Sequence, residues 1–454
     1  MTPVPGRLDI DGLTAAVGEG TVDTVLVAMT DMQGRLQGKR CDAQFFLDEV
    51  AHHATEACSY LLAVDVDMRP VEGYAMSSWE TGYGDFVLRP DLTTLRMLPW
   101  HERTAMCHAD VVWEDRTPVE ESPRRVLQRQ VARLAERGWT GLAGTELELI
   151  VFADSYEEAW GSAYRGLTPA NLYNVDYSLL GTSRVEPLLG RIRREMRAAG
   201  MGVESVKGEC NFGQHEMAFR YGELVEKADE HVVYKTGAKE IAVQEGCSLT
   251  FMAKYDEREG NSCHVHLSVR DADERPVFAG DGAGGFSEVL SSWLAGMLAT
   301  VADFTLLLAP NINSYKRFVP GSFAPTAIAW GRDNRTCAFR VVGEGPSLRV
   351  ECRVPGGDVN PYLAIAALVA GGLHGVEHHL ELGPPYAGNA YAGALPRIPH
   401  TLRDAAQRFG SSPIARAALG DAVVDHYVNM ATVEIEAFDA AVTDWERYRC
   451  FERL

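Results

Sequence analysis

Carboxylates and imidazoles recur in short segments that alternate as β-strands do. The segment GTELEL puts Glu146 and Glu148 on one face, because side chains two apart on a strand point the same way. His264 and His266 share a face of NSCHVHLS in the same manner. Two carboxylates on one face repel each other. A solvated edge strand is therefore the plain alternative for GTELEL taken alone.

More carboxylates stand in other predicted strands. GECNFGQHE supplies Glu209 and Glu216, and RVECR supplies Glu351. Carboxylates with an imidazole suit Mg²⁺ or Mn²⁺ better than Zn²⁺, which favours cysteine and several histidines. Any one of these side chains is better explained as an ordinary core or surface residue. Five carboxylates and two histidines in predicted strands of one region favour a divalent-cation site.

Arginines form a second group. Arg317 lies in NSYKRFVPG, Arg335 and Arg340 lie in GRDNRTCAFR, and Arg349 and Arg353 follow closely. An arginine fork matches carboxylate and phosphate oxygens and stabilises charge during phosphoryl transfer, although surface salt bridges are the competing explanation. Acidic metal ligands beside several arginines favour a metal–nucleotide complex that reacts with an anionic substrate.

The elements that must position these residues fall into two predicted domains, because 454 residues exceed what one core usually organises. The acidic segment EDRTPVEESP marks the junction, which gives domains of residues 1–115 and 116–454. In the second domain, strands mix with helices without regular β-α-β alternation. This pattern predicts an α+β fold with a largely antiparallel sheet.

Local signals place the individual elements. Residues 21–40 read as a strand, a turn around Gly34 and a second strand, before a helical stretch at 42–53. Ser122 and Pro123 form a good start for a helix that Gly138 would end. Further helices are predicted at 183–200, 225–245, 287–308 and 359–375.

Composition excludes several classes of protein. The chain is globular, with 46% hydrophobic residues, and has a formal net charge of −20. That charge argues against nucleic acid or an anionic membrane as a partner. We find no apolar run of membrane-spanning length, and MTPVPGRLDI lacks the basic and apolar parts of a secretory signal. We therefore predict a cytoplasmic protein.

Two further patterns argue against other kinds of site. The nine cysteines are scattered and contain no C-x-x-C pair, which makes a zinc ribbon or a disulfide framework improbable. The glycine-rich GDGAGG at 280–285 lacks the Lys-Ser/Thr ending of a phosphate loop and predicts a surface turn.

The motif order resembles that of glutamine synthetases of the bacterial type I superfamily, over nearly the whole chain. The motifs are GQHE, NSYKRFVPG, AIAWGRDNR and VECRVPGGDVNPYLA. The resemblance implies a small N-terminal β-grasp domain and a large catalytic domain with a curved antiparallel sheet flanked by helices. It also implies a homo-oligomer, a dodecamer whose active sites are completed by the neighbouring subunit.

The resemblance also implies roles for individual residues, with ATP and two or three Mg²⁺ or Mn²⁺ as cofactors. One ion would be held by Glu148, Glu209 and Glu216, and another by Glu146, His264 and Glu351. His266 and Arg335 would contact the nucleotide phosphates, and Gly260 would lie beside the substrate. Glutamate and the transferred phosphoryl group would be held by Arg317, Arg340 and Arg353.

The chain departs from the family pattern at the ammonium end of the site, where family members bind and deprotonate ammonium. Phe323, in PGSFAPTAIAW, stands where the flap usually carries a glutamate. The D-G-S-S motif with the ammonium-deprotonating aspartate is absent, so Asp65 is the candidate base and Asp67 the second. Glu259 stands where the family commonly has asparagine. An apolar ring cannot accept a proton, which disfavours bare ammonium.

These departures predict an ATP-dependent γ-glutamyl-amine ligase that uses glutamate and a primary amine such as ethanolamine or putrescine. Binding of a long polyamine would require additional carboxylates along the entry to the site. The candidates are Glu56, Asp65, Asp67 and Glu259. A true glutamine synthetase using ammonia is the alternative. A metal-dependent hydrolase and a catalytically silent scaffold are two further readings; the arginines argue against the first and the intact ligand set against the second.

Overall fold

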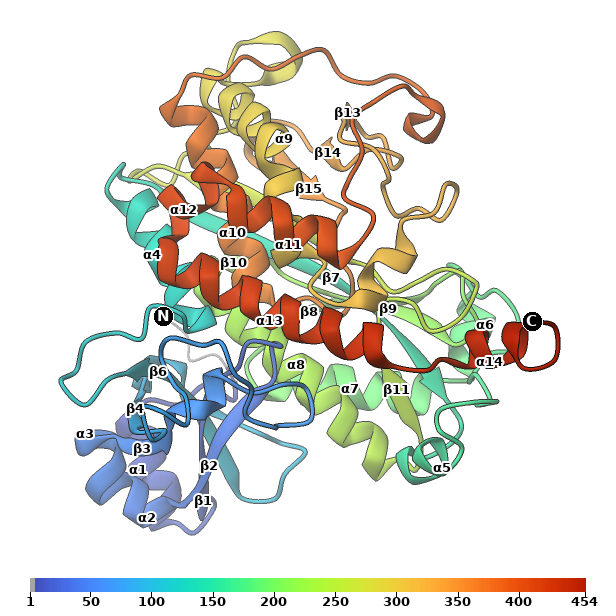
Figure 1. The fold of residues 1–454 in the computed structure, drawn as a ribbon. Helices are drawn as coiled ribbons and strands as arrows, with labels where there is room; N and C mark the ends of the chain where they lie inside the picture. The colour runs from blue at the N-terminus through green and yellow to red at the C-terminus, as the bar shows by residue number, and fades with distance from the viewer. Residues whose placement is uncertain (1–4) are drawn as a thin grey trace.

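The N-terminal sheet has mixed topology. The computed structural model describes residues 5–454. Within them, this sheet contains β1 (Thr24–Thr30), β2 (Leu36–Asp42), β3 (Thr55–Cys58), β4 (Asp85–Pro90), β5 (Arg96–Met97) and β6 (Thr104–Val112). The order is β2-β1-β6-β4-β3, with β5 paired to β6 (Figure 1). β1 runs antiparallel to β2 and parallel to β6.

A hairpin joins β1 to β2, as the sequence predicts. Asp31 shapes its turn, because its carboxylate accepts the backbone N–H of Gln33 at 3.0 Å and of Arg35 at 2.8 Å. The Asn360 side chain, 329 positions after Asp31, donates to the carbonyls of Asp31 and Met32, each at 3.1 Å. The hairpin therefore ties the N-terminal sheet to a distant part of the chain.

Short helices flank this sheet. The predicted helix at 42–53 is present in three pieces: α2 (Ala43–Phe45), a π-helical turn (Phe46–Val50) and α3 (Ala51–His53). The sequence analysis did not identify α1 (Ile10–Gly18). Asp9 begins α1, because its carboxylate accepts the backbone N–H of Gly12 at 2.7 Å.

The second sheet is larger and almost entirely antiparallel. It contains β7 (Thr140–Phe152), β8 (Val203–Gly208), β9 (Gln214–Phe219), β10 (Gly222–Glu223), β11 (Ser248–Thr250), β12 (Cys263–Arg270), β13 (Trp330–Arg332), β14 (Phe339–Val342) and β15 (Arg349–Cys352). Its order is β13-β14-β15-β12-β7-β9-β8, and β10 and β11 also pair with β7. Of these pairs, β13–β14 is parallel and the others are antiparallel.

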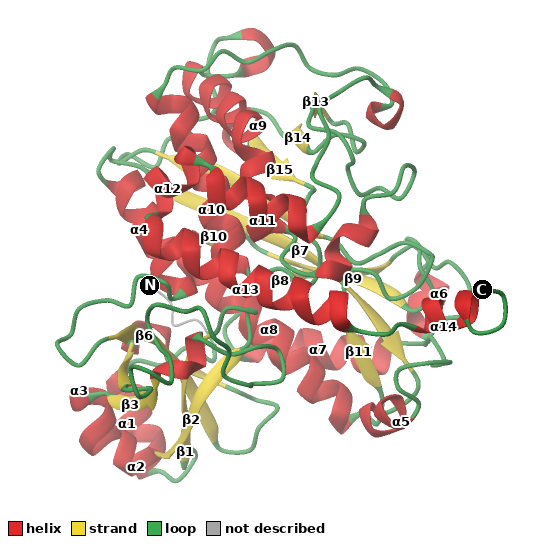
Figure 2. Cartoon of the chain, in the orientation of Figure 1, coloured by secondary structure: helices red, strands yellow, loops and turns green. Residues whose placement is uncertain are grey.

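Helices lie around this second sheet (Figure 2). They are α4 (Pro123–Ala135), α5 (Tyr156–Gly161), α6 (Leu179–Ser183), α7 (Glu186–Ala198), α8 (Leu224–Gln244), α9 (Glu288–Leu308), α10 (Pro361–Glu377), α11 (Leu402–Ser411), α12 (Pro413–Leu419), α13 (Asp421–Ala440) and α14 (Asp444–Cys450). The predicted helices correspond to α4, α7, α8, α9 and α10, with ends shifted by a few residues.

The helices α9 and α10 pack with their backbones in contact. A Cβ on Gly375 would lie 1.9 Å from the carbonyl oxygen of Ser292, so a larger residue cannot fit there. By length and composition alone, α9 is apolar enough to cross a membrane, with a mean hydropathy of 1.4 in its most apolar window. The same stretch is 61% buried inside the fold, which makes α9 a core helix.

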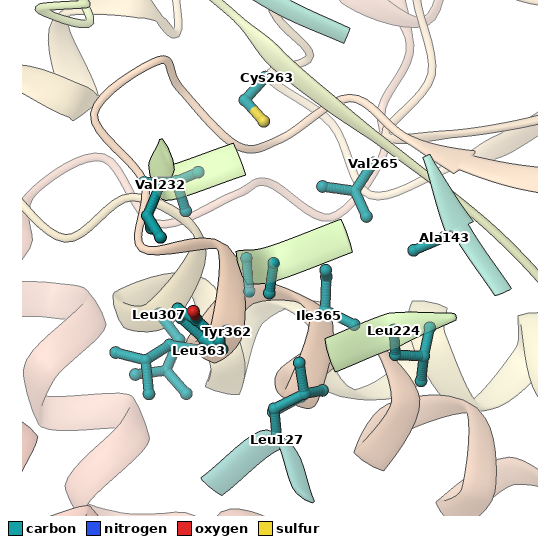
Figure 3. Packing of buried hydrophobic residues seen from close by; sticks show 14 of the residues in the cluster. Leu127, Ala143, Leu224, Val232, Cys263, Val265, Leu307, Tyr362, Leu363 and Ile365 are labelled. Carbon is teal, nitrogen blue, oxygen red and sulfur yellow. The ribbon is translucent and has the colours of Figure 1, made fainter. Parts of the chain in front are cut away.

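One cluster of buried apolar residues holds the helices against the large sheet. Leu127 of α4, Ile365 of α10 and Val265 of β12 belong to it (Figure 3). Leu147 and Leu149 of β7 belong to the same cluster. Since alternate strand residues point to opposite faces, the other face of β7 is free to carry polar side chains.

Candidate active site

Pairing between strands of the large sheet brings the predicted site residues together. β7 carries two of the carboxylates, and its neighbours β9 and β12 place polar residues opposite them. β15 and β14 extend the row beyond β12. The paired residues are Glu148 with Glu216, Glu146 with His264, His266 with Glu351, and Arg340 with Glu351.

Three carboxylates form the first predicted ligand group. Glu148, Glu209 and Glu216 each offer an oxygen, and these oxygens lie within 4.8 Å of one another. Glu148 also accepts the backbone N–H of Ser262 at 2.7 Å and the side-chain amide of Gln214 at 3.1 Å. These donors fix the orientation of Glu148.

The second predicted group meets around His264. His264 Nδ1 lies 3.2 Å from Glu146 Oε2 and 3.6 Å from Glu351 Oε1. His266 Nε2 also lies 3.0 Å from Glu146 Oε1. Glu146 is therefore held between two imidazoles, and it belongs to two overlapping clusters of donor atoms, one with His266 and Glu351 and one with Glu216 and His264.

Burial and mutual repulsion disfavour ionisation of the first group. Burial, followed by the charge of Glu209, raises the pKa of Glu148 to about 7. Burial, followed by the charge of Glu146, raises the pKa of Glu216 to about 8. A bound cation would reverse these shifts by stabilising the charged carboxylates.

In the second ligand group, the surroundings favour the ionised form of the carboxylate Glu146. Burial would raise the pKa of Glu146, but hydrogen bonds from His264 and His266 outweigh it and hold the pKa well below its usual range. Burial, followed by the charge of Arg353, lowers the pKa of His264 to about 4. A neutral imidazole is the form that ligates metals, and His264 Nε2 has no hydrogen-bond partner among residues 5–454. The donor set therefore fits Mg²⁺ or Mn²⁺.

Lys207 lies inside this acidic site, and sequence reasoning missed it. Its ammonium contacts Glu209 and lies 3.8 Å from Glu216, its cross-strand partner between β8 and β9. It also lies 4.8 Å from the ring centre of Tyr177. The alternation in VESVKGEC places Lys207 on the face of Glu209, which is the signal that would have revealed it.

Two of the predicted arginines bind one buried carboxylate. Arg340 Nη1 donates to Glu351 Oε2 at 2.9 Å, and Arg353 Nη1 donates to Glu351 Oε1 at 2.5 Å. Arg340 Nε donates to Asp333 Oδ1 at 2.9 Å. Glu351 is fully buried beneath these guanidinium groups.

Arg317 does not reach the site cavity, although it was expected to hold substrate. It is 1% exposed and donates to Ser262 Oγ at 2.8 Å and to the carbonyl of Val354 at 3.0 Å. It packs against Gly260, where a Cβ would lie 2.7 Å from Arg317 Cγ and 2.2 Å from the carbonyl oxygen of Ala253. Arg317 therefore shapes the wall of the cavity from behind.

A cavity of about 230 Å³ opens between the carboxylates and the arginines. The sequence-predicted residues that line it are Glu146, Glu148, Glu209, Glu216, Gly260, His264, Phe323, Arg335, Arg340 and Arg353. Glu259 lines it as well. Cationic and anionic side chains thus face one small space, which suits an anionic substrate beside bound cations.

A second cavity of about 460 Å³ shares Glu146 and His266 with the site. Its lining includes Tyr221, Ser268 and Arg349. The sequence analysis grouped Arg349 with the other arginines and gave no role to Tyr221 or Ser268. Arg349 Nε donates to His266 Nδ1 at 3.2 Å. An aromatic ring, a hydroxyl and a guanidinium around one space suit a nucleotide, because the guanidinium of Arg349 matches phosphate oxygens.

Two side chains that the sequence analysis placed at the ammonium end line the cavity. Phe323 is 54% exposed, and its backbone φ is +60°, a left-handed conformation that is uncommon for residues other than glycine. Glu259 is half-buried in the same lining. The candidate base Asp65 does not line the cavity. Its carboxylate accepts the backbone N–H of Arg69 at 2.8 Å.

Comparison with known proteins shows the family to which the chain belongs. Residues 120–450 match the family described as glutamine synthetase, catalytic domain. The chain belongs to this family, whose enzymes use ATP and divalent metal ions.

Two relatives and one solved structure are similar to the chain over nearly its whole length. The chain is 64% identical over 455 residues to the γ-glutamylethanolamide synthetase GlnA4 of Streptomyces coelicolor, with 100% of this chain and 98% of the relative covered. It is 36% identical over 434 residues to glutamate–isopropylamine ligase of a Pseudomonas species, with 94% and 95% covered. Its fold is similar to that of a GmaS/ADP complex, at a TM-score of 0.85, 27% identity and full coverage of both chains.

Proposed function

We propose that the protein is an ATP-dependent glutamate–amine ligase that joins the side-chain carboxylate of glutamate to a small primary amine other than ammonia. Ethanolamine is the first candidate, since a relative 64% identical over the whole chain is a γ-glutamylethanolamide synthetase. The observation that carries the proposal is the cavity itself. Its lining contains the carboxylates and arginines that the family pattern implies, but it presents the ring of Phe323 on its acceptor side instead of a glutamate.

The reaction runs in two steps. ATP transfers its terminal phosphoryl group to the glutamate side-chain carboxylate and leaves as ADP. The free amine then attacks the carbonyl carbon of the acyl phosphate, the C–N bond forms, and inorganic phosphate leaves while the amine loses a proton.

The arginines act on the oxygens in both steps. Arg335, Arg340 and Arg353 face the cavity and donate hydrogen bonds to carboxylate and phosphoryl oxygens, which stabilises the charge that develops there. His266 and Arg349 orient the nucleotide phosphates from the second cavity. The buried place of Arg317 supports a positioning role through its contacts with Ser262 and Gly260.

The cation ligands complete the site. Glu148, Glu209 and Glu216 hold one ion, and Glu146, His264 and Glu351 hold another, with two or three Mg²⁺ or Mn²⁺ in all. When bound, these ions supply charge neutralisation for phosphoryl transfer.

The N-terminal part contributes to the acceptor side from a neighbouring subunit. We assign residues 1–115 to a β-grasp domain and residues 116–454 to the catalytic domain; the parallel pairing of β1 with β6 supports the first. Asp65, or Asp67, deprotonates the amine in the adjacent subunit's cavity. The position of Asp65 outside the cavity of its own chain supports this arrangement.

Exposed apolar side chains support assembly into a dodecamer. Helices α6 and α14 expose Leu179 (86%), Leu180 (81%), Trp445 (67%) and Tyr448 (76%). Such a surface is typical of a protein–protein interface. Sedimentation velocity tests the assembly: we expect a species near twelve chains, and a monomer at all concentrations would contradict the proposal.

An assay of ATP-dependent phosphate release tests the function. Glutamate is supplied with ammonium, ethanolamine, putrescine or spermine, and the product is identified by mass spectrometry. We expect release with ethanolamine or a polyamine and little with ammonium. Activity with ammonium alone would identify a true glutamine synthetase, and phosphate release without any amine would indicate a hydrolase.

A further inference from the structure

The segment 386–398 connects two loops that carry site residues. One is the loop of Arg335: Asn334 Nδ2 donates to the carbonyls of Tyr386 at 3.1 Å and Gly388 at 2.9 Å. The backbone N–H of Ala390 donates to Thr336 Oγ1, on the other side of Arg335, at 3.0 Å. These bonds fix one end of the segment on the phosphate side of the cavity.

The other end of the segment holds the flap that carries Phe323. Tyr391 Oη donates to the carbonyl of Ala324 at 3.1 Å. Arg397 Nη1 donates to Thr326 Oγ1 at 3.0 Å, and a backbone bridge pairs Arg397 with Ala327. Of these three contacts, the hydrogen bond from Tyr391 is made to Ala324, the residue directly after Phe323.

The conformation of Phe323 explains why a brace is needed there. Its φ of +60° is unfavourable for a side chain with a Cβ and persists only where neighbours hold the backbone. Within the flap, Ser322 Oγ donates to the carbonyls of Arg317 at 2.9 Å and Val319 at 2.7 Å, which fixes the residue before Phe323. Tyr391 fixes the residue after it.

We propose that Tyr391 is a positioning residue for amine selection, because its hydroxyl holds Ala324 and thereby keeps Phe323 in the acceptor wall. The segment 386–398 also couples the flap to the loop of Arg335. This inference rests on the proposed function, since it assigns the flap to the acceptor side. Tyr391 does not line the site cavity, whereas Phe323 does, so Tyr391 acts through Phe323.

The protonation state of Tyr391 agrees with a donor role. Burial raises the pKa of Tyr391 above its ordinary value, although the nearby charges of Arg353 and Arg317 oppose the shift. The hydroxyl therefore keeps its proton at neutral pH and remains able to donate to Ala324.

The test is Tyr391→Phe, which removes only the hydroxyl. We expect the kcat/KM ratio of ethanolamine to ammonium to fall about 3- to 10-fold, the effect of one neutral hydrogen bond, through a higher KM for ethanolamine. The KM values for ATP and glutamate should not change. Hydrogen exchange of residues 320–326 should become faster.

Matched variants separate positioning from general loosening. Tyr386 lies in the same segment, and its hydroxyl has no hydrogen-bond partner in the described part of the chain. Tyr386→Phe should therefore change neither the selectivity between amines nor the hydrogen exchange of residues 320–326. Asn334→Ala releases the far end of the segment and should speed exchange in residues 320–326, although Asn334 does not touch the flap. Unchanged flap exchange in Asn334→Ala would overturn the coupling.

The outcomes also separate this inference from the proposed function. If the wild-type enzyme accepts ammonium alone, the proposed function fails, whereas flap exchange in Tyr391→Phe still tests the brace. If the wild-type enzyme selects ethanolamine and Tyr391→Phe matches it in selectivity and in flap exchange, Tyr391 does not position the flap.

Discussion

At the scale of single residues, Glu351 holds several groups at once. It accepts hydrogen bonds from Arg340 and Arg353 and lies beside His264. A substitution there disturbs the arginines and the cation ligands together, so a variant that preserves shape is the most informative one.

We expect Glu351→Gln to lose turnover while the fold assembles. The amide keeps the volume of the side chain but removes its charge, so Mn²⁺ affinity should fall by at least about 10-fold. Titration calorimetry measures the affinity, and thermal unfolding checks the fold. Near-normal turnover would show that Glu351 is not a cation ligand.

The flap residue Phe323 gives a second prediction. Phe323→Glu places a carboxylate on the acceptor side, where it can bind ammonium and accept a proton, and should raise the use of ammonium relative to ethanolamine by about 10-fold or more. The ratio of kcat/KM values measures this. Phe323→Leu, an apolar control, should leave ammonium use low. An unchanged ratio in Phe323→Glu would remove the flap from the specificity argument.

Lys207 gives a third prediction. Its ammonium binds the same carboxylates that a cation would bind, so the two compete for Glu209 and Glu216. Lys207→Met should therefore tighten Mn²⁺ binding by about tenfold, whereas Lys207→Arg keeps the competing charge. Calorimetry and Mn²⁺ electron paramagnetic resonance measure this. Weaker Mn²⁺ binding in Lys207→Met would instead mean that Lys207 orients the ligands.

At the scale of elements, the pairing of β7 with β9 sets the acidity of the site. It places Glu148 opposite Glu216, and both pKa values are raised, to about 7 and about 8. Each folded pKa is above the ordinary value of 4.5, so the cation-free fold binds protons more tightly than the unfolded chain. The stability from this proton binding is present at low pH and is lost as pH rises through 7 to 8.

We therefore expect the melting temperature without metal to decline between pH 5 and pH 8. Mn²⁺ must displace these protons, so its affinity should rise over the same range and level off above about pH 8. Differential scanning fluorimetry with EDTA or Mn²⁺ checks both trends. A Mn²⁺ affinity that does not change with pH would show that these carboxylates are ionised before the ion binds.

The sequence predicted the strands and main helices because their signals are local. Alternation in GTELEL and NSCHVHLS, and the Ser122–Pro123 start of α4, need only neighbouring residues. Register between strands is set by contacts far apart in the chain, so the pairing of Glu148 with Glu216 and the place of Lys207 were not predicted. The resemblance to glutamine synthetases implied that Arg317 holds substrate, but a sequence motif gives no depth of burial, and Arg317 supports the cavity from behind.

At the scale of the whole molecule, a buried ion network joins the N-terminal sheet to the helices. Arg124 of α4 donates to Asp229 of α8 at 3.0 Å, to Asp110 of β6 at 2.5 Å and to Asp91 at 2.7 Å. Tyr362 of α10 donates to Asp229 at 2.5 Å. The network fixes how the N-terminal sheet sits against helices α4, α8 and α10.

We expect Arg124→Ala to lower the free energy of unfolding by about 3–5 kcal/mol, because it leaves Asp229 buried without its partner. Arg89→Ala removes an exposed partner of Asp110 and should change it by less than about 1 kcal/mol. Denaturant unfolding of both variants measures the difference. Equal effects would show that the network does not hold the N-terminal sheet to the helices.

The contact of Asn360 with the β1–β2 hairpin has a consequence for synthesis in the cell. Asn360 follows Asp31 by 329 residues, so at ~5–20 residues per second the ribosome makes it roughly 16–66 s later. During that interval the carbonyls of Asp31 and Met32 at the hairpin tip lack the hydrogen bonds from Asn360. Chains released early by a nonsense codon would keep this surface open, which makes them natural clients for chaperones and proteases.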